Sequence, residues 1–139
     1  MGTRTFVDTN ILLYLYDVKE PVKSRAARRA YHGMAPGECV ISTQVLQEFY
    51  WNSTRKLEPG LREDEAARIL VDLSAHETVQ VDVPLIIAAA ARGTSDRIAF
   101  WDALVVESAL SAHCDRLLTE DLQHGRRFGS LRVENPFLP

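Results

Sequence analysis

Residues 5–16 read TFVDTNILLYLY, and this stretch predicts how the rest of the chain is organised. Thr5–Val7 is short and apolar, as expected of a buried strand. Asn10–Tyr16 is too long and too rich in Leu for a strand, so we predict a helix with Asp8 or Thr9 near its N-cap. A strand that passes directly into a helix is typical of α/β folds, and here an acidic side chain stands at the junction.

The remainder of the chain continues the alternation of strands and helices. We predict strands at 39–41, 78–81, 116–119 and 131–133, and helices at 21–32, 43–54, 62–75, 84–92 (ended by Gly93) and 98–113. This order favours an open parallel sheet with helices on both faces. In such folds, ligands bind beyond the carboxyl ends of the strands.

Length and composition fit one globular domain, residues 1–139. Hydrophobic residues make up 46% and charged residues 25% of the chain, which is the balance of an ordinary soluble protein with its own core. Cys39 and Cys114 both lie in apolar stretches, so we expect buried free thiols in a reducing cytoplasm and no disulfide. Because no signal core or membrane-length apolar run is present, we expect a cytoplasmic protein without a membrane partner.

The net charge of −3 argues weakly against binding nucleic acid by bulk charge. A local basic rim is still compatible with that charge. The candidate residues for such a rim are the arginines of one predicted helix and of one predicted loop, namely Arg25, Arg28, Arg29, Arg126 and Arg127. An equally good interpretation is that these arginines only keep a helix face and a loop solvated.

Acidic residues stand where the apolar segments end. Asp8 and the pair Glu120–Asp121 each follow a predicted strand, whereas Glu48 and Asp102 lie within apolar helical patterns. Carboxylates rarely occupy such surroundings without a partner, and no Lys or Arg is spaced to pair with several of them at once. A hard divalent cation would do so, because it takes oxygen ligands and offsets their repulsion. The pattern therefore favours a metal-dependent hydrolase.

Each acid also has a purely structural explanation. Asp8 and Asp121 can cap a helix or a turn. Asp102 can be a first-turn acid favoured by the helix dipole, and Glu48 can extend to solvent from an apolar turn. The argument for a site rests on their conjunction, because the predicted fold gathers strand ends into one crevice.

Four segments, in order along the chain, resemble the motifs of PIN-domain nucleases. They are FVDTNILLY at 6–14, STQVLQEF at 42–49, FWDALVV at 100–106 and LLTEDL at 117–122. The compact chain without appended domains is similar to the VapC-type toxins of toxin–antitoxin pairs. The resemblance implies a three-layer α/β/α sandwich around a parallel sheet.

The same resemblance implies roles for individual residues. It assigns catalysis to four acids, Asp8, Glu48, Asp102 and Asp121. Of these, Asp8, Asp102 and Asp121 would bind Mg²⁺ or Mn²⁺, and Glu48 would be a ligand or a water-orienting base. Two polar residues, Asn10 and Thr119, would orient the acids by hydrogen bonds. Glu120 is outside the usual position and would be a spare or supporting carboxylate.

In function, the resemblance implies an endoribonuclease that cuts single-stranded or loop RNA, is held by a small antitoxin and forms a homodimer. The apolar runs at 12–16 and 49–51 are candidates for that dimer interface or for an antitoxin groove. Two alternatives within the family stay open, a housekeeping nuclease of RNA processing and a non-catalytic PIN-like interaction module. Haloacid-dehalogenase-like phosphatases and receiver domains fit less well. The phosphatases require an Asp-x-Asp motif where this chain has Asp8-Thr9-Asn10.

Overall fold

The computed structural model describes residues 2–139, in which helices and strands alternate along most of the chain. In chain order the elements are β1 (Thr5–Val7), α1 (Thr9–Tyr14), α2 (Pro21–His32), β2 (Cys39–Ser42), α3 (Thr43–Arg55), α4 (Glu63–Leu73), β3 (Glu77–Val79), α5 (Val83–Asp96), α6 (Phe100–Ser111), β4 (Arg116–Leu118), β5 (Arg127–Phe128) and β6 (Leu131–Glu134). They form one six-stranded sheet in the order β3-β2-β1-β4-β6-β5.

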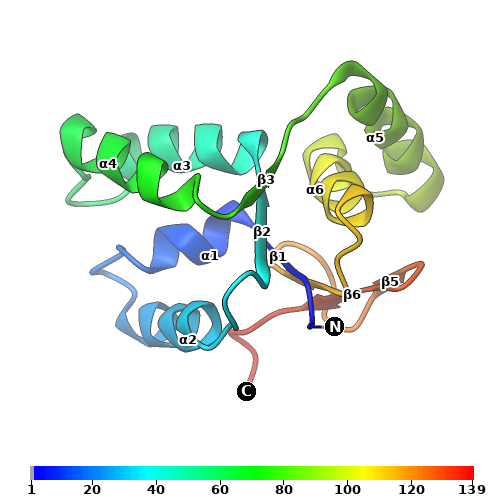
Figure 1. Ribbon diagram of the computed structural model, residues 1–139. Coiled ribbons are helices and arrows are strands. Elements are labelled where there is room, and N and C mark those ends of the chain that lie inside the picture. Colours follow the sequence, from blue (N-terminus) through cyan, green and yellow to red (C-terminus); the bar gives the residue numbers. More distant parts are fainter. Residues whose placement is uncertain (1) are drawn as a thin grey trace.

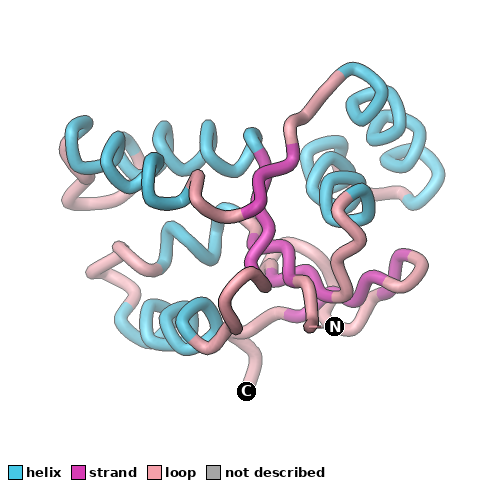
Figure 2. Tube along the Cα trace, in the orientation of Figure 1, coloured by secondary structure: helices cyan, strands magenta, loops and turns pink. Residues whose placement is uncertain are grey.

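Helices cover both faces of this sheet (Figures 1 and 2). On one side α1 packs against α2 and α3, and α3 packs against α4; on the other side α5 packs against α6. Both α3 and α6 also contact β2. The predicted three-layer α/β/α arrangement is confirmed. All neighbouring strands run parallel except β5, which pairs antiparallel with β6.

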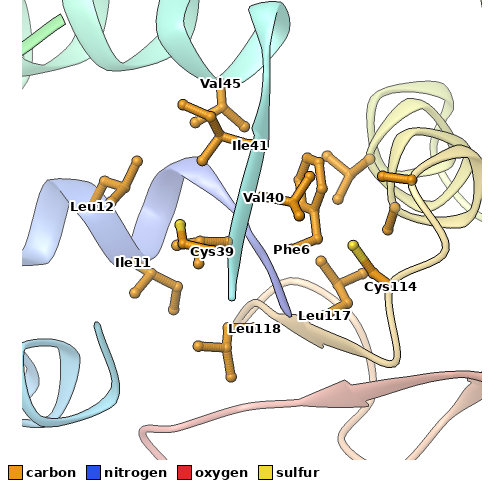
Figure 3. Packing of buried hydrophobic residues seen from close by; sticks show 14 of the residues in the cluster. Phe6, Ile11, Leu12, Cys39, Val40, Ile41, Val45, Cys114, Leu117 and Leu118 are labelled. Atoms are coloured by element: carbon orange, nitrogen blue, oxygen red, sulfur yellow. The ribbon is translucent and has the colours of Figure 1, made fainter. Parts of the chain in front are cut away.

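The core forms because side chains alternate between the two faces of each strand. Figure 3 shows Phe6, Val40 and Leu117 on the side of α6, and Ile41 and Leu118 on the side of α1. Each of these side chains is at most 2% exposed. Full burial of such a side chain contributes roughly 1.5–3 kcal/mol, so this double-sided core is the main source of stability.

Two predicted helix ends are wrong for physical reasons. The first helix ends at Tyr14 and not at Tyr16, because Leu15 is already its C-cap. Gly93 does not end the helix that begins near Pro84; that helix, α5, continues to Asp96 and ends at Arg97, which has a left-handed φ of 55°. A Cβ on Gly93 would lie 3.3 Å from the carbonyl oxygen of Ile98, so this glycine permits the chain to fold back closely behind α5.

The smaller boundary differences are of one or two residues at an end. The helices predicted at 62–75 and 98–113 are shorter, and the strand predicted at 78–81 is Glu77–Val79. Sequence reasoning missed β5, which is only two residues long and is joined to β6 by a tight turn in which Gly129 has a φ of +60°. Strands this short carry too few alternating positions to be found from periodicity.

The distribution of apolar surface differs from the expectation. Leu12 and Leu15 are buried in the core, and within the run at 12–16 only Tyr16 is exposed, at 36%. Trp101, on α6, is 63% exposed. Cys39 and Cys114 are buried free thiols, as predicted. No helix within residues 2–139 is long and apolar enough to cross a membrane.

Candidate active site

The acidic residues that follow β1 and β4 lie side by side because these strands are parallel neighbours. Val7 pairs with Leu118 in the register of the sheet, and the N–H of Asp8 donates to the carbonyl of Leu118 at 3.0 Å. One residue further, the hydroxyl of Thr119 donates to Asp8 Oδ2 at 2.8 Å. The carboxyl edge of the central strands therefore forms the base of the site.

Asp8 is both a helix cap and a member of the site. Its Oδ1 accepts the N–H of Thr9 at 2.7 Å, which caps α1. The amide of Asn10 joins it to the second acid at this edge: Nδ2 lies 3.4 Å from Asp8 Oδ2 and 3.1 Å from Asp121 Oδ2. The same nitrogen is 3.2 Å from the hydroxyl of Thr119. Asn10 and Thr119 thus contact the acids that, by the family resemblance, they would orient.

Glu48 reaches this edge from α3. That helix begins where Ser42 accepts the N–H of Val45 at 3.3 Å, directly after β2. The carboxylate of Glu48 accepts a hydrogen bond on each oxygen, from Thr9 Oγ1 to Oε1 at 2.7 Å and from Gln44 Nε2 to Oε2 at 3.4 Å. Its position is therefore set from two different helices.

Asp102 lies in the first turn of α6 and is half-buried. Burial raises its pKa, and the negative charges of Asp121 and Glu48 raise it further. This coupling places Asp102 in the same electrostatic cluster as the other acids. Neither of its carboxylate oxygens takes part in an ion pair with any residue from 2 to 139.

Asp8 shows the strongest electrostatic effect. Burial raises its pKa, the hydrogen bonds from Thr119 and Thr9 lower it, and the charges of Asp121 and Glu48 raise it again, to a pKa of about 7. A carboxyl group shifted this far at the end of a strand is typical of a functional site. Ion pairs between residues 2–139 include none of the four acids, so no basic side chain offsets their repulsion.

Glu120, predicted as a spare or supporting carboxylate, has polar partners of its own. Its side chain accepts a hydrogen bond from the hydroxyl of Tyr14 at 2.7 Å and forms an ion pair with Lys23 at 3.0 Å. Only its backbone N–H reaches the site, at 3.4 Å from Asn10 Oδ1. The carboxylate has its own cation, and so it does not add to the uncompensated charge.

Sequence reasoning missed Thr9 and Gln44, the two donors to Glu48. Gln44 precedes Glu48 by four residues, a spacing that places both on one face of a helix, and this signal was available. The contact of Thr9 with Glu48 joins residues 39 positions apart and depends on how α1 packs against α3.

The donor chemistry of the cluster suits a hard cation, because all four side chains offer carboxylate oxygen. Within residues 2–139, however, no three His, Cys, Asp or Glu side chains stand in an arrangement that could hold a metal ion. The assignment of Asp8, Asp102 and Asp121 as metal ligands therefore stays a prediction.

Known structures share this fold over nearly the whole chain. A toxin–antitoxin complex from Klebsiella pneumoniae is 18% identical with a TM-score of 0.71, covering 95% of this chain and 97% of that one. The DNA-bound VapBC of Salmonella typhimurium is 16% identical with a TM-score of 0.66, covering 97% and 99%. The sarcin–ricin loop cleaving toxin VapC20 of Mycobacterium tuberculosis is 18% identical with a TM-score of 0.61, covering 81% and 86%.

No curated protein sequence matches the chain significantly. The family model of the PIN domain matches residues 5–127, which include all four acids of the site. Since this match covers most of the chain, the protein belongs to the PIN-domain family.

Proposed function

We propose that this protein is a metal-dependent endoribonuclease and the toxin of a toxin–antitoxin pair. The observation that carries the proposal is the cluster of Asp8, Glu48, Asp102 and Asp121, in which four coupled carboxylates have no cationic partner among residues 2–139. Such a cluster opposes folding unless a ligand of positive charge binds it. PIN-domain membership supports nuclease chemistry at this place.

Asp8, Asp102 and Asp121 would hold Mg²⁺ or Mn²⁺. The ion, when bound, supplies a nucleophilic water at neutral pH and stabilises the charge of the scissile phosphate. Asn10 and Thr119 keep Asp8 and Asp121 in fixed orientations through their hydrogen bonds. Glu48, held on both oxygens, is placed to orient the attacking water or to serve as a further ligand. Cleavage of the P–O3′ bond leaves a 5′-phosphate and a 3′-hydroxyl.

The substrate would be single-stranded or loop RNA, in which the backbone is accessible to a site at the edge of a sheet. Exposed arginines on α2 and β5, including Arg25, Arg29 and Arg127, would contact flanking phosphates. Arg28 and Arg126 contribute less, because their guanidinium groups donate to the carbonyls of Leu15 and Asp96.

Two protein partners follow from the same observations. A small antitoxin that inserts a basic side chain among the four acids would neutralise them, and structures similar in fold include toxin–antitoxin complexes. A second copy of the chain would cover the apolar side chains exposed on α5 and α6, where Val83 is 67%, Ile87 65% and Trp101 63% exposed. Light scattering on the isolated protein tests the dimer, which a monomer at tens of micromolar (order of magnitude) would contradict.

The activity is tested with purified protein, a single-stranded RNA and a stem-loop RNA, each with Mg²⁺ or with EDTA. The parent is expected to cut only with Mg²⁺, and Asp102→Asn is expected to lose most of the cleavage while staying folded. Asp72→Asn, which changes an exposed aspartate of α4, is the matched control and should cut like the parent. Cleavage that survives EDTA, or equal cleavage by both variants, would contradict the proposal.

Growth upon overexpression separates the toxin from a housekeeping nuclease and from an interaction module. A toxin should arrest bacterial growth, and Asp102→Asn should abolish the arrest. Arrest by both proteins would indicate toxicity without catalysis, whereas RNA cleavage without arrest would favour the housekeeping nuclease.

A further inference from the structure

Gln44 connects two helices that each carry one acid of the site, α3 with Glu48 and α6 with Asp102. Its side chain belongs to α3 and is 7% exposed. The nitrogen Nε2 donates to Glu48 Oε2 at 3.4 Å and to the carbonyl oxygen of Trp101 at 3.4 Å. Trp101 directly precedes Asp102 in the first turn of α6. The amide therefore connects the helix of Glu48 to the turn of Asp102, across the two faces of the sheet.

This amide is incompletely hydrogen-bonded. Both contacts of Nε2 lie at the long end of the range for an N–H···O bond. Its oxygen, Oε1, has no partner, and it is the one buried side-chain oxygen or nitrogen atom in residues 2–139 with none. Turning the amide over would not help, because the oxygen would then face a carbonyl and a carboxylate, both of which only accept.

A buried amide that makes fewer bonds than it can is unfavourable for stability and needs another explanation. Oε1 belongs to the same planar group as Nε2, so it lies within a few ångströms of the carboxylate of Glu48. Since Oε1 is buried without a partner, the contribution of this amide lies in the contacts of Nε2 with Glu48 and with the carbonyl of Trp101.

We infer that Gln44 is a positioning residue of the acidic site, because its Nε2 holds the carboxylate of Glu48 against the first turn of α6. The inference rests on the proposed function. Thr9 holds the other oxygen of Glu48 at 2.7 Å, so loss of Gln44 leaves the carboxylate attached at one oxygen and free to turn.

The test compares Gln44→Met with Gln47→Met. Gln47 lies on the same helix and is exposed, so the control makes the same chemical change without touching the site. For each protein, thermal unfolding is followed with EDTA and through a Mg²⁺ titration, and cleavage of a single-stranded RNA is measured. Both changes are repeated in a Glu48→Gln background.

Gln44→Met should unfold with EDTA at the same temperature as the parent or higher, because an apolar side chain replaces an incompletely bonded amide. The Mg²⁺ concentration for half of the stabilisation should rise, and cleavage should slow, each by about 10- to 100-fold, which is typical for groups that orient metal ligands. In the Glu48→Gln background, Gln44→Met should add little, because it acts through Glu48. Gln47→Met should match the parent throughout.

Three outcomes would overturn the inference. The first is a Mg²⁺ response and cleavage of Gln44→Met equal to those of Gln47→Met. The second is the same loss of cleavage in both backgrounds, which would mean that Gln44 does not act through Glu48. The third is a large fall in the melting temperature of Gln44→Met with EDTA, which would mean that the amide serves the stability of the fold. A parent that neither cuts RNA nor responds to Mg²⁺ would refute the proposed function itself, and that result is read from the parent alone.

Discussion

The two ends of the central sheet carry carboxylates in opposite electrostatic states. At the amino end Glu77 pairs with Arg4, and Arg116, the first residue of β4, pairs with Glu38 at 3.1 Å. Burial alone would raise the pKa of Glu38, but hydrogen bonds from Thr5 and the N–H of Ala35, together with the charge of Arg116, lower it. At the carboxyl end, burial and neighbouring acids raise the pKa of Asp8 to about 7.

The difference shows that burial by itself does not determine the pKa of an acid, because hydrogen bonds and neighbouring charges decide the net direction. At the amino end, guanidinium groups pair with the mostly buried Glu38 and with the exposed Glu77 and so stabilise the fold. At the carboxyl end, the four acids of the site have no ion-pair partner among residues 2–139, which works against the apo fold and favours a positively charged ligand. Substitutions at the two ends should therefore have opposite effects on stability.

The largest effect is expected for Asp8→Asn on catalysis. Cleavage of RNA with Mg²⁺ should fall by about 1,000-fold or more, roughly 4 kcal/mol, because a carboxylate proposed to hold the ion is lost. Initial rates measure the loss, and circular dichroism checks that the variant is folded. A variant that cuts within a few-fold of the parent would remove Asp8 from the site.

The same substitution should change how the stability of the apo protein depends on pH. A carboxyl pKa raised from 3.8 to about 7 means that the folded state keeps a proton that the unfolded state has released. This contribution is fully present below the unfolded pKa and is lost as pH rises through 7. Between pH 5 and pH 8 with EDTA, the parent should lose about 2–3 kcal/mol that Asp8→Asn does not lose. Urea unfolding of both proteins measures the difference, and parallel pH curves would contradict the raised pKa.

A smaller effect of opposite sign is expected at the amino end. Arg116→Met should destabilise the protein by roughly 1–2 kcal/mol at pH 7, because it leaves the mostly buried Glu38 without a cation. Since the pKa of Glu38 is lowered in the folded state, the stabilisation is present at neutral pH and is lost as pH falls below its usual range near 4.5. The variant should show a smaller acid-side loss, because the hydrogen bonds from Thr5 and Ala35 to Glu38 remain. Arg127→Met, on an exposed arginine of β5, should leave stability unchanged and serves as the control.

The smallest effect is expected for the pair of Lys23 and Glu120. Lys23 is 39% exposed in its side chain, so Lys23→Met should cost less than about 1 kcal/mol of stability. Glu120→Gln should leave Mg²⁺-dependent cleavage near the parent value, because the carboxylate of Glu120 is already neutralised. If Glu120→Gln lost cleavage as Asp8→Asn is expected to, the acid cluster would have to include Glu120.

The sequence by itself determined the layered α/β fold and the place of the acids. Strand and helix periods distinguish the elements, and parallel strands bring their carboxyl ends to one edge, so Asp8 and Asp121 were predictable as neighbours. The motif order added Glu48 and Asp102 as members of one set. Each of these inferences depends on spacing within an element or on the order of elements, and both can be read from the sequence.

Only the tertiary structure decided which side chains the acids meet. Glu120 and Asp121 are adjacent in sequence, yet Glu120 turns to Lys23, 97 residues earlier, while Asp121 contacts Asn10. The unpaired oxygen of Gln44 likewise follows from the distance between α3 and α6. Periodicity assigns residues to a face of a helix, but the partner on that face is set by the packing of segments remote in the chain, because burial and charge compensation depend on all neighbours together.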